Sequence, residues 1–490
     1  MPLQVDQLRW MADRLGDEVA YVDLLRDEEL TFARWDDESN RFARHLISIG
    51  VRPGDRVALL LESTWACRWM VAYAAIHIAG AVAVPVNTRL TGREVTTVLA
   101  HAEPTVAVTS RTLAGLLPPI GSVITVDDDV IWLRSLEHDG QRLDPPVDDG
   151  DLADLMYTSG TTGLPKGIAV RHRNTHIIPN GEPKWTGDSW IHASPLFTFA
   201  GITFIYNPMK LGMRGLFMSR FDAGRWLEIV EHRRPTMAFL VPSMVQLLVN
   251  DPAFEESDLS SLTLVSIGSA PLAPSLQWRL ADRLPNTSVT NSYSMTEAGT
   301  TFTLMPPSEI RNRPGSVGLV LPPSEIRICD PDGNSVPADE VGEVLIKVGD
   351  GHREYYQDPE ATARTWRGGW LSSGDLGKID ADGYLYIVGR AKDVIIRGGN
   401  NIHATDVEAV LFEHPAVADA AVVAIDHPVL GEDVGAAVVL GSDHDVDAAE
   451  LTAFCAERLA DYKVPRSIWF VDELPRNAMG KVLKRDIHRP

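Results

Sequence analysis

Eleven residues in the first half of the chain read Tyr157-Thr158-Ser159-Gly160-Thr161-Thr162-Gly163-Leu164-Pro165-Lys166-Gly167. Four small hydroxyl residues, three glycines and one lysine leave little side-chain bulk here, so a ligand can approach the backbone closely. Backbone N–H groups and hydroxyls can converge on an anion, and Lys166 adds a positive charge. An apolar run lies on each side. The stretch therefore predicts an ordered polyphosphate-binding loop between two strands rather than a flexible linker.

The spacing within this loop differs from that of P-loop nucleotidases, which is G-x-x-x-x-G-K-[ST]. Lys166 follows Pro165 and precedes Gly167, and no Ser or Thr follows the lysine to hold magnesium. A P-loop ATPase is therefore disfavoured.

Composition and charge exclude several classes of protein. A chain of 490 residues with 44% hydrophobic and 23% charged residues is globular and long enough for two to four domains. The net charge of −22 argues against nucleic acid or an anionic membrane surface as the main partner. The three cysteines, Cys67, Cys329 and Cys455, are far apart, which predicts neither disulfides nor a metal cluster and favours a reducing, cytoplasmic setting. We expect no signal peptide at residues 1–17 and no membrane span, because the apolar run at 70–85 is too short.

Strands and helices alternate along most of the chain, which predicts parallel sheets covered on both faces. One such region covers residues 18–172, and a second runs from 189 to about 304. The strands predicted in the second region each end in small or polar residues: 190–194, 215–218, 237–241, 264–267 and 289–293. Ligands of open α/β sheets lie at the carboxyl ends of the strands, so we expect these ends to line one cleft with the loop. Glycines and turn pairs over 314–389 predict a small antiparallel barrel, and 393–490 predicts a compact α+β tail.

Further clusters of chemistry-bearing residues follow the loop along the chain. They read Gly268-Ser269-Ala270-Pro271-Leu272, Tyr293-Ser294-Met295-Thr296-Glu297, Gly369-Trp370-Leu371-Ser372-Ser373-Gly374-Asp375-Leu376-Gly377, Gly389-Arg390-Ala391-Lys392-Asp393, Arg397-Gly398-Gly399-Asn400-Asn401-Ile402 and Pro475-Arg476-Asn477-Ala478-Met479-Gly480-Lys481-Val482. Each has an ordinary structural explanation when it is taken alone. Asp375 fits a turn former, Thr296-Glu297 fits a helix N-cap with an acidic first turn, Lys481 fits a solvated lysine, and Gly398-Gly399 fits a simple turn.

Taken together and in this order, the clusters resemble those of the adenylate-forming superfamily of acyl-CoA synthetases, luciferases and nonribosomal-peptide adenylation domains. The nearest resemblance is to bacterial acyl- or aryl-CoA ligases, and it extends from Leu30-Thr31 to Lys481. It implies an α/β fold with a large N-terminal domain of two doubly wound sheets and a small β-barrel. A small mobile α+β domain would follow. The implied boundaries are 1–389 for the N-terminal domain, with the barrel-like part at about 314–389, 390–392 for a hinge, and 393–490 for a C-terminal lid.

The implied reaction is attack of a carboxylate on the α-phosphate of ATP, giving an acyl-adenylate and pyrophosphate. Negative charge builds up on phosphoryl oxygens, so catalysis consists mostly of positioning and charge stabilisation. The resemblance implies catalytic roles for Lys166, Thr296, Glu297 and Lys481, with Glu297 as the ligand of Mg²⁺. It implies that the ATP- or AMP-binding residues are Thr158, Ser159, Gly160, Thr161, Thr162, Gly163, Gly268, Ser269, Ala270, Pro271, Asn291, Tyr293, Ser294, Asp375, Ile387 and Arg390.

Within that set, the resemblance assigns particular contacts. Tyr293 would stack on adenine opposite the wall formed by 268–271. Asp375 would accept from both ribose hydroxyls, and Arg390 would contact ribose or phosphate. Lys481 would bridge the substrate carboxylate and the α-phosphate.

The resemblance also implies a second half-reaction with coenzyme A. The C-terminal domain would rotate about Lys392, carry Lys481 away and bring a thiol tunnel formed by Arg397, Gly398, Gly399 and Asn400 to the cleft. The thiol would then attack the mixed anhydride to give a thioester and AMP. An amine or a carrier-protein thiol as acceptor stays open, as does a non-catalytic nucleotide-binding protein. A homodimer and a separate carrier protein are open as well.

Three positions depart from common family patterns. Thr198 and Ser294 stand where histidine and glycine are frequent, and Ala404 replaces a frequent proline. The expected acyl pocket is lined by Phe197, Thr198, Phe199, Ile202, Val241, Ser243, Ile267 and Met295, with Gly268 beside them. This set is apolar and contains no arginine or lysine to pair a second carboxylate. We therefore expect a small-molecule monocarboxylic acid, aliphatic or aromatic, as the substrate.

Overall fold

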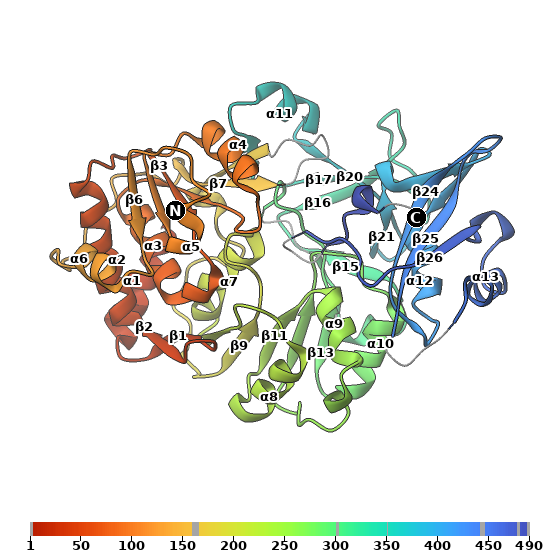
Figure 1. The fold of residues 1–490 in the computed structure, drawn as a ribbon, viewed down its shortest axis with the longest axis horizontal. Helices are drawn as coiled ribbons and strands as arrows, with labels where there is room; N and C mark the ends of the chain where they lie inside the picture. The colour runs from red at the N-terminus through yellow and green to blue at the C-terminus, as the bar shows by residue number, and fades with distance from the viewer. Residues whose placement is uncertain are drawn as a thin grey trace.

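Four sheets organise the chain (Figure 1). A computed structural model describes residues 3–158, 166–299, 303–349, 351–441, 446–477 and 481–487. The architecture is α/β, with a large N-terminal domain and a smaller C-terminal domain, as the sequence predicts. Among the described residues, no helix combines the length and the apolar character that a bilayer crossing needs.

The first sheet contains the strand before the predicted loop and the strand after it. Its order is β18-β8-β7-β4-β3-β5-β6, parallel from β7 to β6 and antiparallel at β8 and β18. Its strands are β3 (Arg56–Leu60), β4 (Val82–Pro85), β5 (Val106–Thr109), β6 (Ser122–Thr125), β7 (Leu152–Thr158), β8 (Lys166–Arg171) and β18 (Glu354–Tyr355). The α-helices of this part of the chain are α1 (Gln4–Leu15), α2 (Phe32–Ser48), α3 (Ala66–Ile78), α4 (Gly92–Ala102), α5 (Arg111–Ala114) and α6 (Asp129–Ser135).

The second sheet has the order β13-β12-β11-β9-β10-β1-β2 and is parallel except for β2. Its strands are β1 (Val19–Asp23), β2 (Glu28–Thr31), β9 (Ser189–His192), β10 (Arg214–Phe217), β11 (Met237–Leu240), β12 (Leu264–Ile267) and β13 (Ser288–Asn291). Four α-helices alternate with these strands: α7 (Phe199–Lys210), α8 (Ala223–Arg233), α9 (Pro242–Val249) and α10 (Pro274–Arg283). Strands β1 and β2 pair with each other, and β1 also pairs with β10, so both belong to the sheet of the second α/β region and not to the sheet that contains β3.

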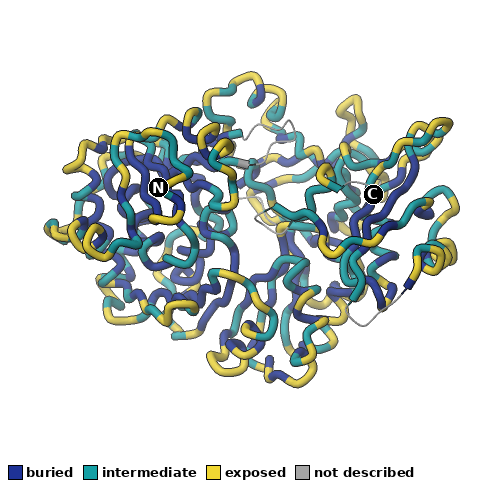
Figure 2. Tube along the Cα trace, viewed as in Figure 1, coloured by how far each residue is buried: buried dark blue, intermediate teal, exposed yellow. Residues whose placement is uncertain are grey.

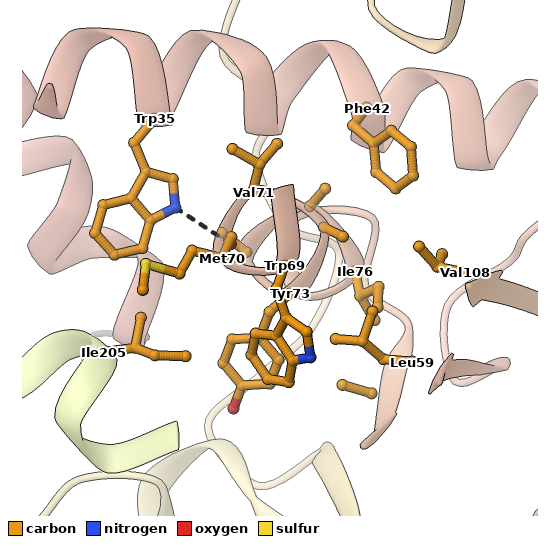
Figure 3. Close-up of a cluster of buried hydrophobic side chains, with 14 of the residues drawn as sticks. Trp35, Phe42, Leu59, Trp69, Met70, Val71, Tyr73, Ile76, Val108 and Ile205 are labelled. Atoms are coloured by element: carbon orange, nitrogen blue, oxygen red, sulfur yellow. Dashed lines mark hydrogen bonds between the residues drawn. The ribbon is translucent and has the colours of Figure 1, made fainter. Parts of the chain in front are cut away.

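The main core lies between these two sheets, around α3 (Figures 2 and 3). Helix α3 is apolar on most of its surface, every residue except Arg68 is buried, and the helix packs against α2. Trp35 on α2 and Trp69 on α3 are both fully buried, and the Trp35 indole donates to the Met70 carbonyl at 3.2 Å. Burial of each such ring contributes about 3 kcal/mol of stability. This core fixes the two sheets relative to each other.

The third sheet is antiparallel, with the order β14-β15-β21-β20-β17-β16 and β19 beside β20. Its strands are β14 (Thr303–Leu304), β15 (Ser316–Val320), β16 (Glu325–Cys329), β17 (Gly342–Lys347), β19 (Trp366–Arg367), β20 (Trp370–Ile379) and β21 (Leu385–Arg390), and helix α11 spans Pro359–Thr365. Figure 1 shows this sheet between the two α/β sheets and the C-terminal domain.

The C-terminal domain has its own sheet and core. The sheet order is β23-β22-β25-β24, and β26 pairs with β25. The strands are β22 (Val394–Arg397), β23 (Asn400–His403), β24 (Val417–His427), β25 (Gly431–Leu440) and β26 (Ser467–Phe470), with helices α12 (Ala404–Leu411) and α13 (Ala448–Ala456). Residues of both helices and of β24 and β25 form one apolar cluster. Ala404 is the first residue of α12, a helix position that proline also suits.

Candidate active site

The predicted polyphosphate loop joins the paired ends of β7 and β8, where Thr158 lies opposite Lys166. The residues Ser159, Gly160, Thr161, Thr162 and Gly163 lie outside the described part of the chain. Strand β18 contacts the base of the loop from the side. The Tyr356 amide donates to the Gly167 carbonyl at 2.7 Å, and the Lys166 Nζ lies 4.9 Å from the centroid of the Tyr355 ring. A segment almost 200 residues downstream therefore holds one end of the loop.

Asp375 is the centre of a buried polar cluster on β20 and β21. The Tyr293 hydroxyl donates to its Oδ2 at 2.6 Å, and the Arg390 Nε lies 3.0 Å from its Oδ1. Asp375 and Arg390 face each other across the two strands. Burial, and then the nearby Asp375 carboxylate, raise the pKa of Tyr293 well above its usual value, so this hydroxyl remains a donor. An ionised carboxylate only accepts hydrogen bonds, so Asp375 suits a ligand that presents hydroxyl groups.

Lys481 reaches this cluster from the C-terminal tail. Its backbone forms a tight pair with Asn477, in which the Asn477 amide donates to the Lys481 carbonyl at 2.8 Å and the Lys481 amide donates to Asn477 Oδ1 at 2.9 Å. Burial, and then the Arg390 charge, lower the pKa of Lys481 to about 8, although the Asp375 charge opposes both. The tail therefore places an ammonium group within electrostatic reach of the Asp375 carboxylate.

The Thr296-Glu297 cluster forms a turn after β13. The amides of Ala298 and Gly299 both donate to the Met295 carbonyl at 3.1 Å. Burial raises the pKa of Glu297, while Arg390 and Arg353 lower it. A carboxylate beside a threonine hydroxyl is an oxygen donor set that suits a hard cation such as Mg²⁺. Among the residues that the structure describes, no group of three metal-ligating side chains gathers, so a cation here would need oxygens from its ligand.

The wall predicted for adenine follows β12. Ser269 has φ of +72°, a left-handed backbone that favours glycine, and both Ser269 and Pro271 are exposed. Gly268 lies close to the next strand end, because an added Cβ would be 3.1 Å from Ser292 Oγ. Asn291 lies opposite Ile267 in the sheet, and Ser294 is exposed. Tyr293, Met295 and Ile387 pack against one apolar cluster of the third sheet.

The expected acyl-pocket residues come from three places in the fold. Phe197, Thr198, Phe199 and Ile202 lie at the start of α7, Val241 and Ser243 lie at the junction of β11 and α9, and Ile267 ends β12. Ile202 and Ile267 are buried in separate cores.

Thr198, which stands where histidine is frequent, is the N-cap of α7. Its hydroxyl accepts from the Gly201 amide at 3.0 Å and donates to the Pro195 carbonyl at 2.8 Å, so the side chain is fully engaged by backbone.

Position 201, in the first turn of α7, requires glycine because the backbone of Pro195 lies very close to it. An added Cβ would lie 2.0 Å from the Pro195 carbonyl oxygen. We expect Gly201→Ala to lower the free energy of unfolding by about 1–3 kcal/mol through overpacking. Gly224→Ala, in the first turn of α8, is the matched control, because the nearest atom there is 3.6 Å away. Urea unfolding of both variants checks this, and equal stability of the two would contradict it.

The predicted thiol tunnel is a hairpin turn between β22 and β23. Gly398 and Gly399 have φ of +55° and +87°, and they join the facing residues Arg397 and Asn400. The turn is exposed, and Arg397 Nε donates to Asp433 Oδ1 at 2.6 Å within the same domain. Lys392 is exposed on the turn that joins the domains. Lys481, not this hairpin, thus lies at the cleft in this structure.

Two residues that the motifs did not indicate also contact the site. Arg353 donates to the Thr296 carbonyl, and its guanidinium carbon lies 4.4 Å from the centroid of the Phe199 ring. Tyr355 adjoins Glu297, and burial, and then the Glu297 charge, raise the pKa of the tyrosine to about 12. Both lie in Gly351-His352-Arg353-Glu354-Tyr355-Tyr356, a run with no periodicity or catalytic spacing. Only its pairing with β8 brings it to the site.

Two family models match successive parts of the chain. The AMP-binding enzyme model matches residues 8–356, and the AMP-binding enzyme C-terminal domain model matches residues 406–481. The chain belongs to the AMP-binding enzyme family. This confirms the resemblance to adenylate-forming enzymes that the ordered clusters indicate.

Individual relatives cover nearly the whole chain. A feruloyl-CoA synthase from an Amycolatopsis species is 36% identical over 486 residues, covering 94% of each chain. A 2-succinylbenzoate–CoA ligase from Geobacillus kaustophilus is 35% identical over 464 residues, covering 94% of this chain and 92% of its own. Among solved structures, the anthranilate CoA ligase AuaEII in complex with anthranoyl-AMP superimposes with a TM-score of 0.89 and 27% identity, covering 99% of this chain and 96% of its own.

Proposed function

We propose that the protein activates a carboxylic acid with ATP to an acyl-adenylate and then transfers the acyl group to the thiol of coenzyme A. The observation that carries this proposal is that Lys481 lies within electrostatic reach of Asp375, which is buried and paired with Arg390. A cation on a separate small domain, facing a carboxylate acceptor at the ends of strands, suits a reaction between two anions. A protein that only binds nucleotide would have no evident need for this lysine.

The nucleotide would bind against residues that are already oriented. Asp375 is held by Tyr293 and Arg390, so its lone pairs are aimed before ribose hydroxyls arrive. Ser269 and Pro271 are exposed in the segment that would form the wall beside adenine. The phosphates would extend toward Lys166 at the end of the loop.

Adenylation requires a carboxylate to approach a phosphate of the same charge. The Lys481 ammonium would lie between them and offset their repulsion, and the Thr296 hydroxyl would donate to a phosphoryl oxygen as its charge grows. Mg²⁺ bound through Glu297 would neutralise further phosphate charge. Each of these side chains is buried or partly buried, so its charge is screened less than it would be in open water.

The acid that we propose is a monocarboxylate with an apolar body. The expected pocket residues are mostly apolar, and the Arg353 guanidinium already donates to two backbone carbonyls. The relatives named above act, according to their names, on feruloyl, 2-succinylbenzoate and anthranilate groups. Aromatic acids are therefore the first class to test, and fatty acids are the second.

Exchange of labelled pyrophosphate into ATP, scanned over aromatic and aliphatic acids, tests the first half-reaction. We expect acid-dependent exchange with at least one aromatic acid. The second half-reaction is tested by adding coenzyme A, a simple amine or a phosphopantetheinyl carrier protein to the best acid and following AMP. Coenzyme A should accelerate AMP release most. If AMP release is faster with the amine or with the carrier protein, that compound is the acceptor instead of coenzyme A. If no acid supports pyrophosphate exchange, the protein does not form an acyl-adenylate.

The lowered pKa of Lys481 predicts how adenylation depends on pH. In the free enzyme the ammonium is charged below pH 8 and neutral above it, so kcat/KM for ATP should fall about tenfold per pH unit above pH 8. The fall in kcat should begin at a higher pH, because bound phosphates favour the charged ammonium. Lys481→Arg keeps its charge throughout this range and should remove the alkaline fall. If that fall persists in Lys481→Arg, it belongs to another group.

A further inference from the structure

Arg353 is an arginine in an unusual place, with 2% of its surface exposed. It lies just before β18, where the chain leaves the third sheet and pairs with β8 of the first. Arginine is almost never fully buried unless its charge and donors are paired. Burial lowers its pKa to about 10, while Asp154 and then Glu297 oppose that shift, so the guanidinium is charged near neutral pH.

The guanidinium is held on three sides. Its Nη1 donates to the Thr296 carbonyl at 2.7 Å, and its Nη2 donates to the Asn174 carbonyl. The Phe199 ring covers one face. Gly299 makes room for it, because a Cβ at that position would lie 2.6 Å from the guanidinium carbon. Arg353 therefore packs directly on the turn that carries Thr296 and Glu297.

The backbone of Arg353 is fixed as firmly as its side chain. The Trp366 indole donates to the Arg353 carbonyl at 2.9 Å, and the Asn174 side chain donates to the His352 carbonyl at 3.2 Å. Two residues later, Tyr355 lies opposite Ile168 in β8, whose first residue is Lys166. One short segment thus contacts both the base of the polyphosphate loop and the Thr296 turn.

We propose that Arg353 is a positioning residue that fixes the Thr296 turn relative to Lys166, so that the Thr296 hydroxyl and the lysine meet the same polyphosphate. This role rests on the proposed adenylation reaction. A purely structural role would instead make Arg353 matter for folding alone. The two roles make different predictions for a variant that folds well but holds the Thr296 carbonyl less tightly. Such a variant loses activity if Arg353 positions the turn, and keeps it if Arg353 serves folding alone.

Arg353→Lys is such a variant, because it keeps the charge but loses the two-pronged donor. We expect kcat for pyrophosphate exchange to fall 30- to 100-fold, since small displacements of reacting groups cost about that much. KM for ATP should change less than threefold. Arg353→Gln, which also loses the charge, should lose more activity than Arg353→Lys. Arg171→Gln is the matched control. It lies on the same strand pair, but its Nη2 is 3.6 Å from the exposed Glu354, and it should retain wild-type kcat.

Hydrogen exchange of the unliganded protein supplies a readout that does not depend on catalysis. The Ala298 and Gly299 amides close the Thr296 turn, so they should exchange at least fivefold faster in Arg353→Lys, while amides of β24 and β25 stay unchanged. Unchanged kcat or unchanged exchange at these two amides would overturn the proposal, as would an equal loss in Arg171→Gln or uniformly faster exchange. If wild-type protein shows no pyrophosphate exchange, the proposed function fails. The amide exchange then still decides whether Arg353 holds the turn.

Discussion

Lys481→Ala is expected to lower the rate of acid-dependent pyrophosphate exchange by about 100- to 1,000-fold, the usual cost of removing one group that stabilises developing charge. The physical reason is the place of the ammonium. It is partly buried, and it lies within electrostatic reach of Asp375 and Arg390. In this poorly solvated place, water screens the charge weakly, so its loss is not easily compensated.

The same variant should differ little from wild type when it is given preformed acyl-adenylate and coenzyme A. We expect that rate to change less than threefold. Lys463→Ala is the matched control, because Lys463 lies on the same domain and its Nζ pairs with Asp406 at 2.6 Å rather than with the Asp375 cluster. It should keep both half-reactions. Equal losses of both half-reactions in Lys481→Ala would contradict a lysine that serves adenylation alone.

That separation of half-reactions depends on a rotation of the C-terminal domain, which stays a prediction. Lys481 lies at the cleft here, while the Gly398-Gly399 turn is exposed. The contacts between the domains include a hydrogen bond from the Thr405 hydroxyl to the Val388 carbonyl at 2.6 Å. A turn of the domain about Lys392 would break this hydrogen bond. The arrangement seen here fits the first half-reaction.

Local sequence patterns predict much of the fold, because most strands are short apolar runs followed by helices with a single apolar face. The mostly apolar run over Ala66–Ile78 correctly indicates a buried helix. Local patterns could not predict which sheet β1 and β2 join. These strands precede α2 and β3 in the chain, yet β1 pairs with β10, nearly 200 residues away. Periodicity shows which face of a strand is buried but not which distant strand lies beside it.

The site residues also fall into two groups, those that sequence patterns predict and those that they do not. Lys481, Asp375 and Tyr293 lie in distinctive clusters whose order identifies the family, and the structure brings these three together. Arg353 and Tyr355 carry no local signal. Their place follows from β18 crossing between two sheets, which is a long-range pairing of only two residues. Thr198, in contrast, is visible in the sequence as a departure from the family pattern, and the structure explains it as the cap of α7.

Asp375→Asn is expected to raise KM for ATP about 30- to 100-fold while lowering kcat less than fivefold. The substitution keeps the shape of the side chain but replaces an acceptor-only carboxylate with an amide that is also a donor. Hydrogen bonds to a charged group contribute about 1.5–3 kcal/mol each, which corresponds to this change in affinity. The Tyr293 hydroxyl and Arg390 would also lose a charged partner, so the acceptor would be aimed less firmly.

Asp382→Asn is the matched control for this prediction. Asp382 lies in the next turn of the same sheet and is mostly exposed, and it pairs with Arg313 at 2.5 Å rather than with the cluster. It should leave KM and kcat unchanged. Steady-state kinetics over ATP concentration, with thermal unfolding to confirm that both variants fold, separates the outcomes. If Asp375→Asn lowers kcat at unchanged KM, the carboxylate acts in the chemical step instead of holding ribose. If it behaves like Asp382→Asn, the nucleotide binds elsewhere.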